Sequence, residues 1–183
     1  RQHEKCKRYS FDAIVTGIRA YNTREDLAFA KEALNEYVKN GGTWLVQYNT
    51  SRRIKVDQIG PYAFELSRER VTDETASPEF LAPDHPVLNI PNEISMTDFD
   101  GWVQERGLYF ANEWDDNFVP ILGWSDPDEP SRNGALIVAP YGDGYFVYSG
   151  ISFFRELPAG VSGAYRLLSN ILALSKSQDG GNE

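Results

Sequence analysis

The N-terminal part of the chain shows apolar blocks that predict a strand, a helix and a second strand. Residues 11–18 are mostly apolar and end near Gly17, as a buried parallel strand does. A helix should follow, with Thr23 as its N-cap and Gly41-Gly42 as its stop. Its apolar face consists of Leu27, Ala30, Leu34, Tyr37 and Val38. Residues 43–48 form the second strand, so we predict a βαβ unit with parallel strands and a right-handed crossover.

The middle of the chain is less regular. A short strand is predicted at 62–66, and a long ordered loop at 70–91, where 84–88 open a helical turn. Residues 98–124 are dense in aromatic side chains, and residues 125–133 predict an exposed loop.

The C-terminal third predicts a hairpin and a helix. Two apolar runs, 135–139 and 144–149, flank an Asp143-Gly144 turn, which is a strong hairpin signal. A final helix is predicted from 160 to 174. We therefore expect a single domain over 10–175, with a tail or linker at 1–9 and a flexible tail at 176–183.

Composition excludes several classes of function. The 183 residues carry a net charge of −9, which argues against nucleic acid and against an anionic membrane surface as partners. No apolar run has the length of a membrane span, so no membrane insertion is expected. Cys6 is the single cysteine, and His3 and His85 are the two histidines, so we expect no intrachain disulfide, metal site or cofactor. Because the chain starts with Arg1, a fragment or processed product is expected.

Polar side chains follow the predicted parallel strands. Ligands of open parallel sheets bind beyond the carboxyl ends of the strands, so these side chains should line one crevice. The candidate ligand-binding residues are Arg19, Tyr21, Asn22, Gln47, Tyr48, Asn49, Arg155 and Glu156. The same residues would serve equally well as loop caps, and Arg155 with Glu156 as a structural ion pair.

Two further groups of residues allow a functional interpretation. Trp102, Tyr109 and Trp114 are candidates for stacking on sugar rings, although a packed sub-core over the sheet edge is the favoured interpretation. Carboxylates are frequent between Asp98 and Glu129, and could hold calcium or act on a sugar. Their irregular spacing favours a solvated surface.

The segments FDAIVTGIRAYN, NGGTWLVQYNTS and GALIVAPYGDGYFVYSGISFFRELPAG, with Ser169-Asn170 in the last helix, carry a resemblance. They resemble a class I glutamine amidotransferase-like domain. More narrowly, IRAYN, DFDGWVQERGLYF and SFFRELPAG make residues 9–174 similar to the domain at the C-terminus of large bacterial PIG-L/LmbE-type deacetylase polypeptides. The resemblance implies a three-layer α/β, flavodoxin-like fold with a mainly parallel sheet and an antiparallel hairpin near the C-terminus. That fold normally has one or two βα units before the strand at Phe11.

The departures from that family decide the expected function. The family's nucleophilic cysteine would follow the second strand, where this chain has Gln47-Tyr48-Asn49. Thr50 or Ser51 would need a positioned base to act as a nucleophile, and we expect His85 to bond backbone in its loop instead. The deacetylase zinc site cannot be rebuilt from two distant histidines, so no catalytic residue is assigned.

We therefore predict a non-catalytic accessory domain that binds a ligand or glycan, or acts as a scaffold, within a larger deacetylase-like, carbohydrate-processing protein. Its partners would be other domains of that protein and a carbohydrate. The resembled family implies a periplasmic or extracellular location. A hydrolase using Glu105 or Asp84 and His85, and a purely assembly-mediating domain, stay open as alternatives.

Overall fold

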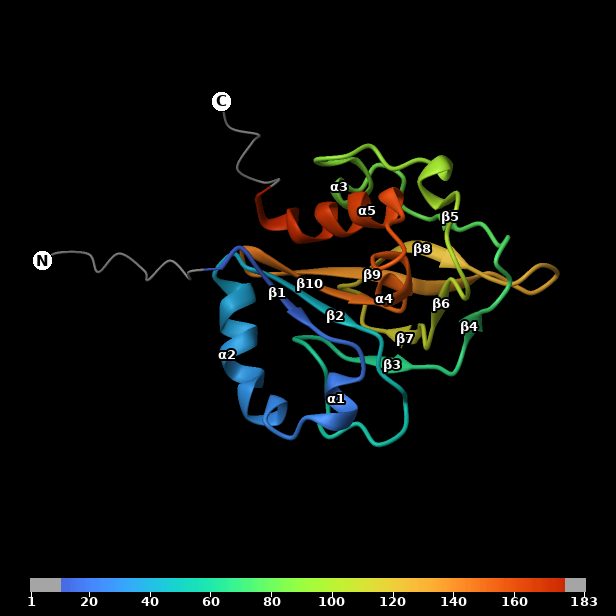
Figure 1. Cartoon of the computed structure of the whole chain (residues 1–183). Helices are drawn as coiled ribbons and strands as arrows, with labels where there is room; N and C mark the ends of the chain where they lie inside the picture. The colour runs from blue at the N-terminus through green and yellow to red at the C-terminus, as the bar shows by residue number, and fades with distance from the viewer. Residues whose placement is uncertain (1–10, 177–183) are drawn as a thin grey trace, which may run out of the picture.

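A six-stranded sheet runs through the centre of the molecule (Figure 1). The computed structural model describes residues 11–176. The strands lie in the order β1-β2-β10-β9-β8-β5. Their bounds are Ala13–Thr16 for β1, Thr43–Gln47 for β2, Glu79–Phe80 for β5, Val119–Trp124 for β8, Arg132–Tyr141 for β9 and Gly144–Ser149 for β10.

The prediction of a mainly parallel, flavodoxin-like sheet is wrong. Strands β1, β2 and β10 are parallel, but the β10–β9, β9–β8 and β8–β5 pairings are all antiparallel. Half of the sheet is therefore a meander-like antiparallel extension in place of further βα units. Two local predictions are confirmed: β1 pairs parallel with β2, and β9 and β10 form a hairpin around Gly142-Asp143.

Seven helical segments accompany the sheet in the described range. They are α1 (Ala20–Thr23), α2 (Leu27–Lys39), α3 (Pro86–Asn89), the 3₁₀ turn η1 (Met96–Phe99), α4 (Phe153–Glu156), α5 (Ser162–Leu172) and the 3₁₀ turn η2 (Leu174–Lys176). Thr23 was predicted to cap the first long helix, but it ends α1, and its hydroxyl donates to the Arg19 carbonyl. The long helix instead begins after Asp26.

Two small sheets come from the middle of the chain. β3 (Phe64–Leu66) pairs with β7 (Ala111–Trp114), and β4 (Arg70–Val71) pairs with β6 (Gly107–Leu108). The predicted loop at 70–91 thus contains β4, β5 and α3, although the helical turn expected at its end is present as α3. The predicted loop at 125–133 ends where β9 begins, at Arg132.

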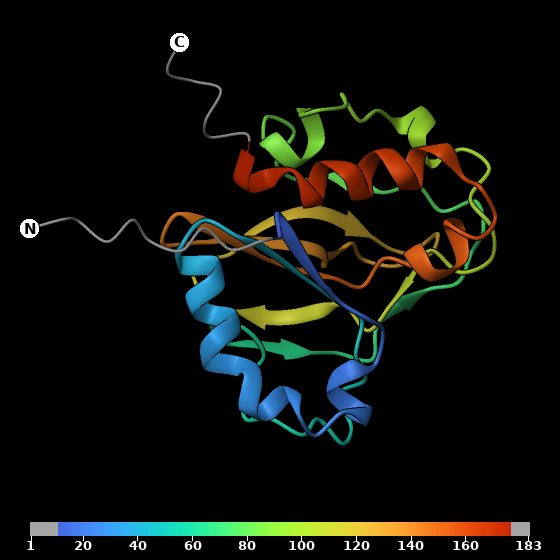
Figure 2. The ribbon, with the colours of Figure 1, turned by 60° about the vertical axis from the view of Figure 1, so that its left-hand side comes forward.

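The sheet separates two apolar cores. α5 and α3 cover one face, while α2 and the β3–β7 pair lie on the other (Figure 2). Neighbouring residues of β2 point to opposite cores, Leu45 towards α5 and both Trp44 and Val46 towards α2, as the two-residue strand repeat requires. Burial on both faces explains why β2, β9 and β10 read as continuous apolar runs.

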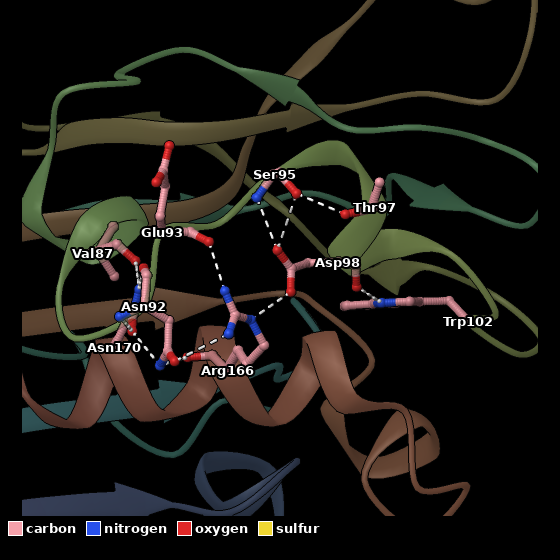
Figure 3. Close-up of polar contacts among 9 residues, drawn as sticks. All are labelled: Val87, Asn92, Glu93, Ser95, Thr97, Asp98, Trp102, Arg166 and Asn170. Carbon is pink, nitrogen blue, oxygen red and sulfur yellow. Dashed lines mark hydrogen bonds and ion pairs between the residues drawn. The ribbon is translucent and has the colours of Figure 1, made fainter.

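A polar network attaches the 87–102 segment to α5 (Figure 3). The buried Asn170 makes four hydrogen bonds: its amide donates to the carbonyls of Val87 and Asn92, and its carbonyl accepts from the backbone and side-chain nitrogens of Asn92. One turn earlier, Arg166 bonds Asp98 at 2.7 Å and the Glu93 carbonyl at 2.7 Å. Because the side chains of this network use their hydrogen-bonding groups on one another and on nearby backbone, we assign the network a structural role.

Candidate functional site at the carboxyl end of the parallel strands

The carboxyl ends of β1, β2 and β10 leave the sheet at the same edge, because these three neighbouring strands are parallel. The segments that follow them hold Arg19 after β1, Tyr48 after β2, and Phe154 and Arg155 in α4 after β10. The predicted crevice residues therefore gather at one edge of the sheet. Some of their side chains bond neighbouring loops, some are partly exposed at the surface, and that of Glu156 is buried.

Asn22 and Asn49 fasten two loops together. Asn22 donates to the carbonyls of Thr50 and Arg52 and accepts from the Thr50 backbone nitrogen. Asn49 is fully buried, and its amide accepts from the Tyr21 backbone nitrogen and donates to the Gln47 carbonyl. The Tyr21 ring is buried as well. These three side chains hold the edge in shape, while Gln47 is half-buried beside them.

Tyr48, Tyr109 and Phe154 form an aromatic cluster at this edge. The Tyr48 ring centroid lies 5.4 Å from that of Phe154 and 6.0 Å from that of Tyr109. Tyr109 and Phe154 are partly exposed, whereas Tyr48 is largely buried beneath them. Burial raises the pKa of the Tyr48 phenol, and the nearby charge of Arg19 lowers it. The cluster thus offers an apolar face bordered by a cation.

A chain of charged side chains continues from the aromatic cluster. The Arg155 guanidinium lies 5.1 Å from the Phe154 ring centre and donates to Glu105 at 2.5 Å and to the Gln104 side chain. The other Glu105 oxygen accepts from Arg70 at 2.6 Å. Here we define the carboxyl-end surface as Arg19, Tyr48, Gln104, Glu105, Tyr109, Phe154 and Arg155.

Backbone strain concentrates on this surface. Arg19, Gln104 and Tyr109 have φ values of 54°, 57° and 57°, in the left-handed region that non-glycine residues rarely adopt. The backbone nitrogen of Arg19 donates to the Tyr48 carbonyl at 2.8 Å, and that of Tyr109 donates to the Glu69 carbonyl at 2.7 Å. Strained residues that the surrounding structure holds in place are frequent at binding sites.

Arg70 links this surface to a groove of about 500 Å³. Three arginines (Arg68, Arg70 and Arg132) and three carboxylates (Glu69, Asp126 and Glu129) line it together with Thr72. Asp126 accepts hydrogen bonds from Thr72 and Asp73, and Arg132 is paired with Glu69 and Glu129. Asp126, Arg132 and both glutamates are thus bonded within the protein.

Glu156 lies behind the surface rather than on it. Its side chain is fully buried, and one carboxylate oxygen accepts from the Val103 backbone nitrogen at 2.9 Å. Burial raises the pKa of this carboxyl, opposed by the Val103 bond and by the charges of Arg106 and Arg155. The alternative of an Arg155–Glu156 structural pair does not match the contacts, because Arg155 pairs with Glu105.

The predicted sugar-stacking residues are separated. Trp102 is buried against Phe99 and Trp124, and its indole nitrogen donates to the Asp98 carbonyl, so neither ring face is free. Trp114 sits at the end of β7 against the α2-side core, in the strand that pairs with β3. Tyr109 alone of the three lies on the carboxyl-end surface.

The remaining catalytic candidates are occupied or outside the described residues. The His85 ring nitrogen Nδ1 accepts from the Val87 backbone nitrogen, which confirms the expected backbone bond. Cys6 and His3 lie outside the described residues. Within 11–176, no group of three or more His, Cys, Asp or Glu side chains could hold a metal ion. In the same range, no helix is long and apolar enough to cross a membrane.

Gln104, Arg106, Ser152 and Arg70 belong to this region but were not among the sequence-derived candidates. Arg106 is buried and Ser152 is fully buried, whereas sequence reasoning places such polar side chains in solvent. The proximity of Gln104 and Arg106 to Arg155 and Glu156 depends on the packing of residues 103–106 against 152–156, which no local pattern encodes.

No family model matches the chain, and no curated protein sequence matches it. Solved structures do match. A β-galactosidase from Rahnella sp. R3 gives a TM-score of 0.54 at 14% identity over 92% of this chain and 23% of that one. A β-galactosidase from Bacillus circulans sp. alkalophilus gives 0.53 at 10% identity, over 91% and 23%. A cytoplasmic protein from Salmonella typhimurium gives 0.51 at 18% identity, over 88% and 70%.

These likenesses show a shared fold. This chain spans less than a quarter of the length of either galactosidase, 23% in each case. None of these three proteins is described as an amidotransferase or a deacetylase, so the resemblance to those families stays a prediction.

Proposed function

We propose that this chain is a non-catalytic accessory domain that binds carbohydrate at its carboxyl-end surface. The observation that carries the proposal is the juxtaposition of the Phe154 ring with the Arg155–Glu105 pair, beside the Tyr48 and Tyr109 rings. Sugar rings present apolar faces and hydroxyl edges, so they bind where aromatic rings and fixed polar groups meet. The wider protein would act on carbohydrate, and its deacetylase identity stays a prediction.

Within residues 11–176, neither Thr50 nor Ser51 is paired with a base that could activate its hydroxyl, and this supports binding over catalysis. The hydroxyl of Thr50 donates to the Arg52 carbonyl, and Ser51 is exposed in the same loop. A hydroxyl becomes nucleophilic when a base accepts its proton. Among the described residues, no hydroxyl is bonded to His85, whose Nδ1 is taken by Val87.

The alternative function, a hydrolase, would use the Glu105 carboxylate as a catalytic group. Both of its oxygens accept from arginine donors, Arg155 at 2.5 Å and Arg70 at 2.6 Å. Each oxygen keeps a second acceptor position, so this positioned Arg–Glu–Arg array can bind hydroxyl groups. The arrangement favours recognition.

Two of the structural neighbours are β-galactosidases, which is the context for the carbohydrate part of this proposal. The β-galactosidases named above contain a region of the same fold within a much longer chain. Their name places that region in proteins that act on a sugar. The likeness itself, at 10–14% identity, shows the fold alone. The accessory position and the carbohydrate class enter here as part of our proposal.

Titration calorimetry against a panel of monosaccharides, amino sugars and short oligosaccharides tests the proposal. The wild type should bind at least one member, and Tyr109→Ala and Arg155→Ala should each weaken that binding by about tenfold or more. Phe29→Ala is the matched control, because Phe29 is an exposed aromatic residue (89%) on α2. Binding to no sugar, or equal loss in all three variants, would contradict the proposal.

Hydrolysis assays distinguish the binding proposal from the alternative that the chain is a hydrolase. Incubation with chromogenic glycosides, esters and N-acetyl sugars should release no product above background. Turnover that disappears in Glu105→Gln or His85→Ala would replace the binding proposal with the hydrolase.

A further inference from the structure

Buried polar atoms without a partner concentrate behind the carboxyl-end surface. In the described part of the chain, seven buried side-chain atoms lack a hydrogen-bond partner, and five of them belong to residues 106, 152, 155 and 156. They are Nε and Nη1 of Arg106, Oγ of Ser152, Nε of Arg155 and Oε1 of Glu156. Native proteins leave few such groups, and each one needs a physical explanation.

The residues that carry these atoms lie side by side. The Ser152 backbone nitrogen donates to the Arg106 carbonyl at 3.0 Å, and the Glu156 backbone nitrogen donates to the Ser152 carbonyl at 3.3 Å. Glu156 in turn accepts from Val103. Arg106 is 4% exposed, and Ser152 and Glu156 are fully buried. We call Arg106, Ser152 and Glu156 the inner polar cluster.

Electrostatics places the charges of this cluster within reach of one another. Burial lowers the pKa of Arg106, while the carboxylates of Glu156, Glu74 and Asp73 oppose that effect. Arg106 and Glu156 nevertheless form no direct ion pair among the described contacts, so opposite charges face each other with unused hydrogen-bonding capacity. Two guanidinium donors, one carboxylate acceptor and one hydroxyl remain available.

That set of groups matches a specific ligand chemistry. A hydroxyl group accepts from a guanidinium and donates to a carboxylate at the same time, which an anion or an apolar group cannot do. A second, adjacent hydroxyl could bond Ser152. We propose that the inner polar cluster is the deep end of the carbohydrate site and binds two neighbouring hydroxyl groups of one sugar residue. This inference rests on the proposed function.

Arg155 belongs both to the carboxyl-end surface and to the residues behind it with a buried, unpartnered atom. Its terminal nitrogens bond Gln104 and Glu105 on the surface, while its buried Nε has no partner in the described structure. The 101–105 segment contacts the cluster, since the Val103 backbone nitrogen donates to Glu156. The cluster is buried, so sugar binding there requires a local opening of the fold.

The cluster is costly to the folded protein, and this gives a sharp test. A buried hydroxyl without a partner destabilises the fold, so Ser152→Ala should leave the thermal midpoint unchanged or raise it. The same change should weaken sugar binding by about fivefold or more. Gain of stability with loss of binding is typical of a group kept for its ligand.

Ser149→Ala is the matched control. Ser149 is also fully buried on β10, but its hydroxyl accepts from the Ile151 backbone nitrogen at 3.2 Å. We expect this variant to lower the thermal midpoint and to bind sugar as the wild type does. The pair therefore separates a ligand-binding hydroxyl from a structural one.

Nuclear magnetic resonance on the full chain measures sugar binding to the wild type directly, so this readout does not depend on the binding of any variant. The Nε–H resonance of Arg106, assigned through its absence in Arg106→Lys, should shift when D-galactose or N-acetyl-D-glucosamine is added. Singly deoxygenated analogues of the sugar that binds should produce a smaller shift.

The outcomes distinguish this inference from the proposed function. If Tyr109→Ala abolishes binding while Ser152→Ala binds like the wild type, the inner cluster holds internal water and this inference is wrong, although the proposed function stands. A lower thermal midpoint in Ser152→Ala would support the same conclusion. If no sugar binds the wild type, both proposals fail together.

Discussion

The hydroxyl of Tyr148 donates a hydrogen bond of 2.7 Å to the carbonyl oxygen of Tyr109. Tyr148 belongs to the buried strand β10, whereas Tyr109 is a partly exposed residue in the left-handed conformation. The same hydroxyl accepts from the Asn49 backbone nitrogen at 3.5 Å. One core side chain thus fixes the loop after β2 and the segment that carries the surface ring of Tyr109.

Removing that hydroxyl should destabilise the protein. Tyr148→Phe leaves the Tyr109 carbonyl and the Asn49 N–H without their partner in a buried site, which costs about 1–2 kcal/mol of unfolding free energy. Urea denaturation followed by tryptophan fluorescence measures this loss. Tyr165→Phe is the control: its hydroxyl bonds the Leu157 carbonyl in an exposed position, where water can replace it. Equal losses in both variants would show that the Tyr148 bonds are not special.

Asn170 should be among the least replaceable residues of α5. Asn170→Ala removes four hydrogen bonds at once and leaves the carbonyls of Val87 and Asn92 unpaired inside the protein. We expect a loss of about 3 kcal/mol or more, and thermal melting should show it clearly. The neighbouring Ser169→Ala, at an exposed position, should change stability little. A mild effect of Asn170→Ala would mean that the segment is held mainly by Arg166.

The parallel strands and the β9–β10 hairpin could be predicted from sequence, whereas β8 and β5 could not. β1, β2 and β10 are apolar runs bounded by glycine, with a helix or a hairpin turn beside them. β8 contains Pro120 and Gly123, which argue against a strand, and its register with β9 shifts at both Pro120/Leu122 and Leu122/Trp124. β5 has two residues, too few for any periodicity. Its pairing depends on contacts distant in sequence.

The candidate site shows the same division. Arg19, Tyr48 and Arg155 were expected at one edge of the sheet because each follows a strand, and the structure places them there. The sequence could not show that the side chains of Asn22 and Asn49 bond neighbouring loops, because each amide has its partner 28 residues away. Nor could it find Arg106, since a buried arginine is exceptional in soluble proteins.

Gly163 should not tolerate any side chain. It lies where α5 crosses η1, and a Cβ atom at this position would come within 1.7 Å of the Asp98 carbonyl oxygen. Gly163→Ala must push the helix away from backbone atoms, so we expect a loss of about 2 kcal/mol or more in thermal or urea unfolding. Gly17→Ala is the control, because no heavy atom lies within 4 Å of its added Cβ. A stable Gly163→Ala variant would contradict the close approach of α5 and η1.

His85 should make the protein less stable in mild acid. Burial lowers the pKa of His85, and its neutral Nδ1 accepts from Val87 at the start of α3. In the unfolded chain the pKa of the ring is about 6.5. Between that value and the lowered folded pKa, the unfolded state binds more protons, so the free energy of unfolding rises with pH. The stabilisation is present above about pH 6.5 and is lost as the pH falls towards the folded pKa.

Urea denaturation at pH 7.5 and at pH 5.5, on the wild type and on His85→Asn, isolates this effect. Asparagine retains a side-chain acceptor for the Val87 nitrogen and does not titrate, so it preserves the cap without the proton linkage. The difference in unfolding free energy between the two pH values should therefore be smaller in His85→Asn than in the wild type. Identical pH dependence in both proteins would assign the acid sensitivity to carboxylates, and a variant weakened equally at both pH values would show that the imidazole matters for packing.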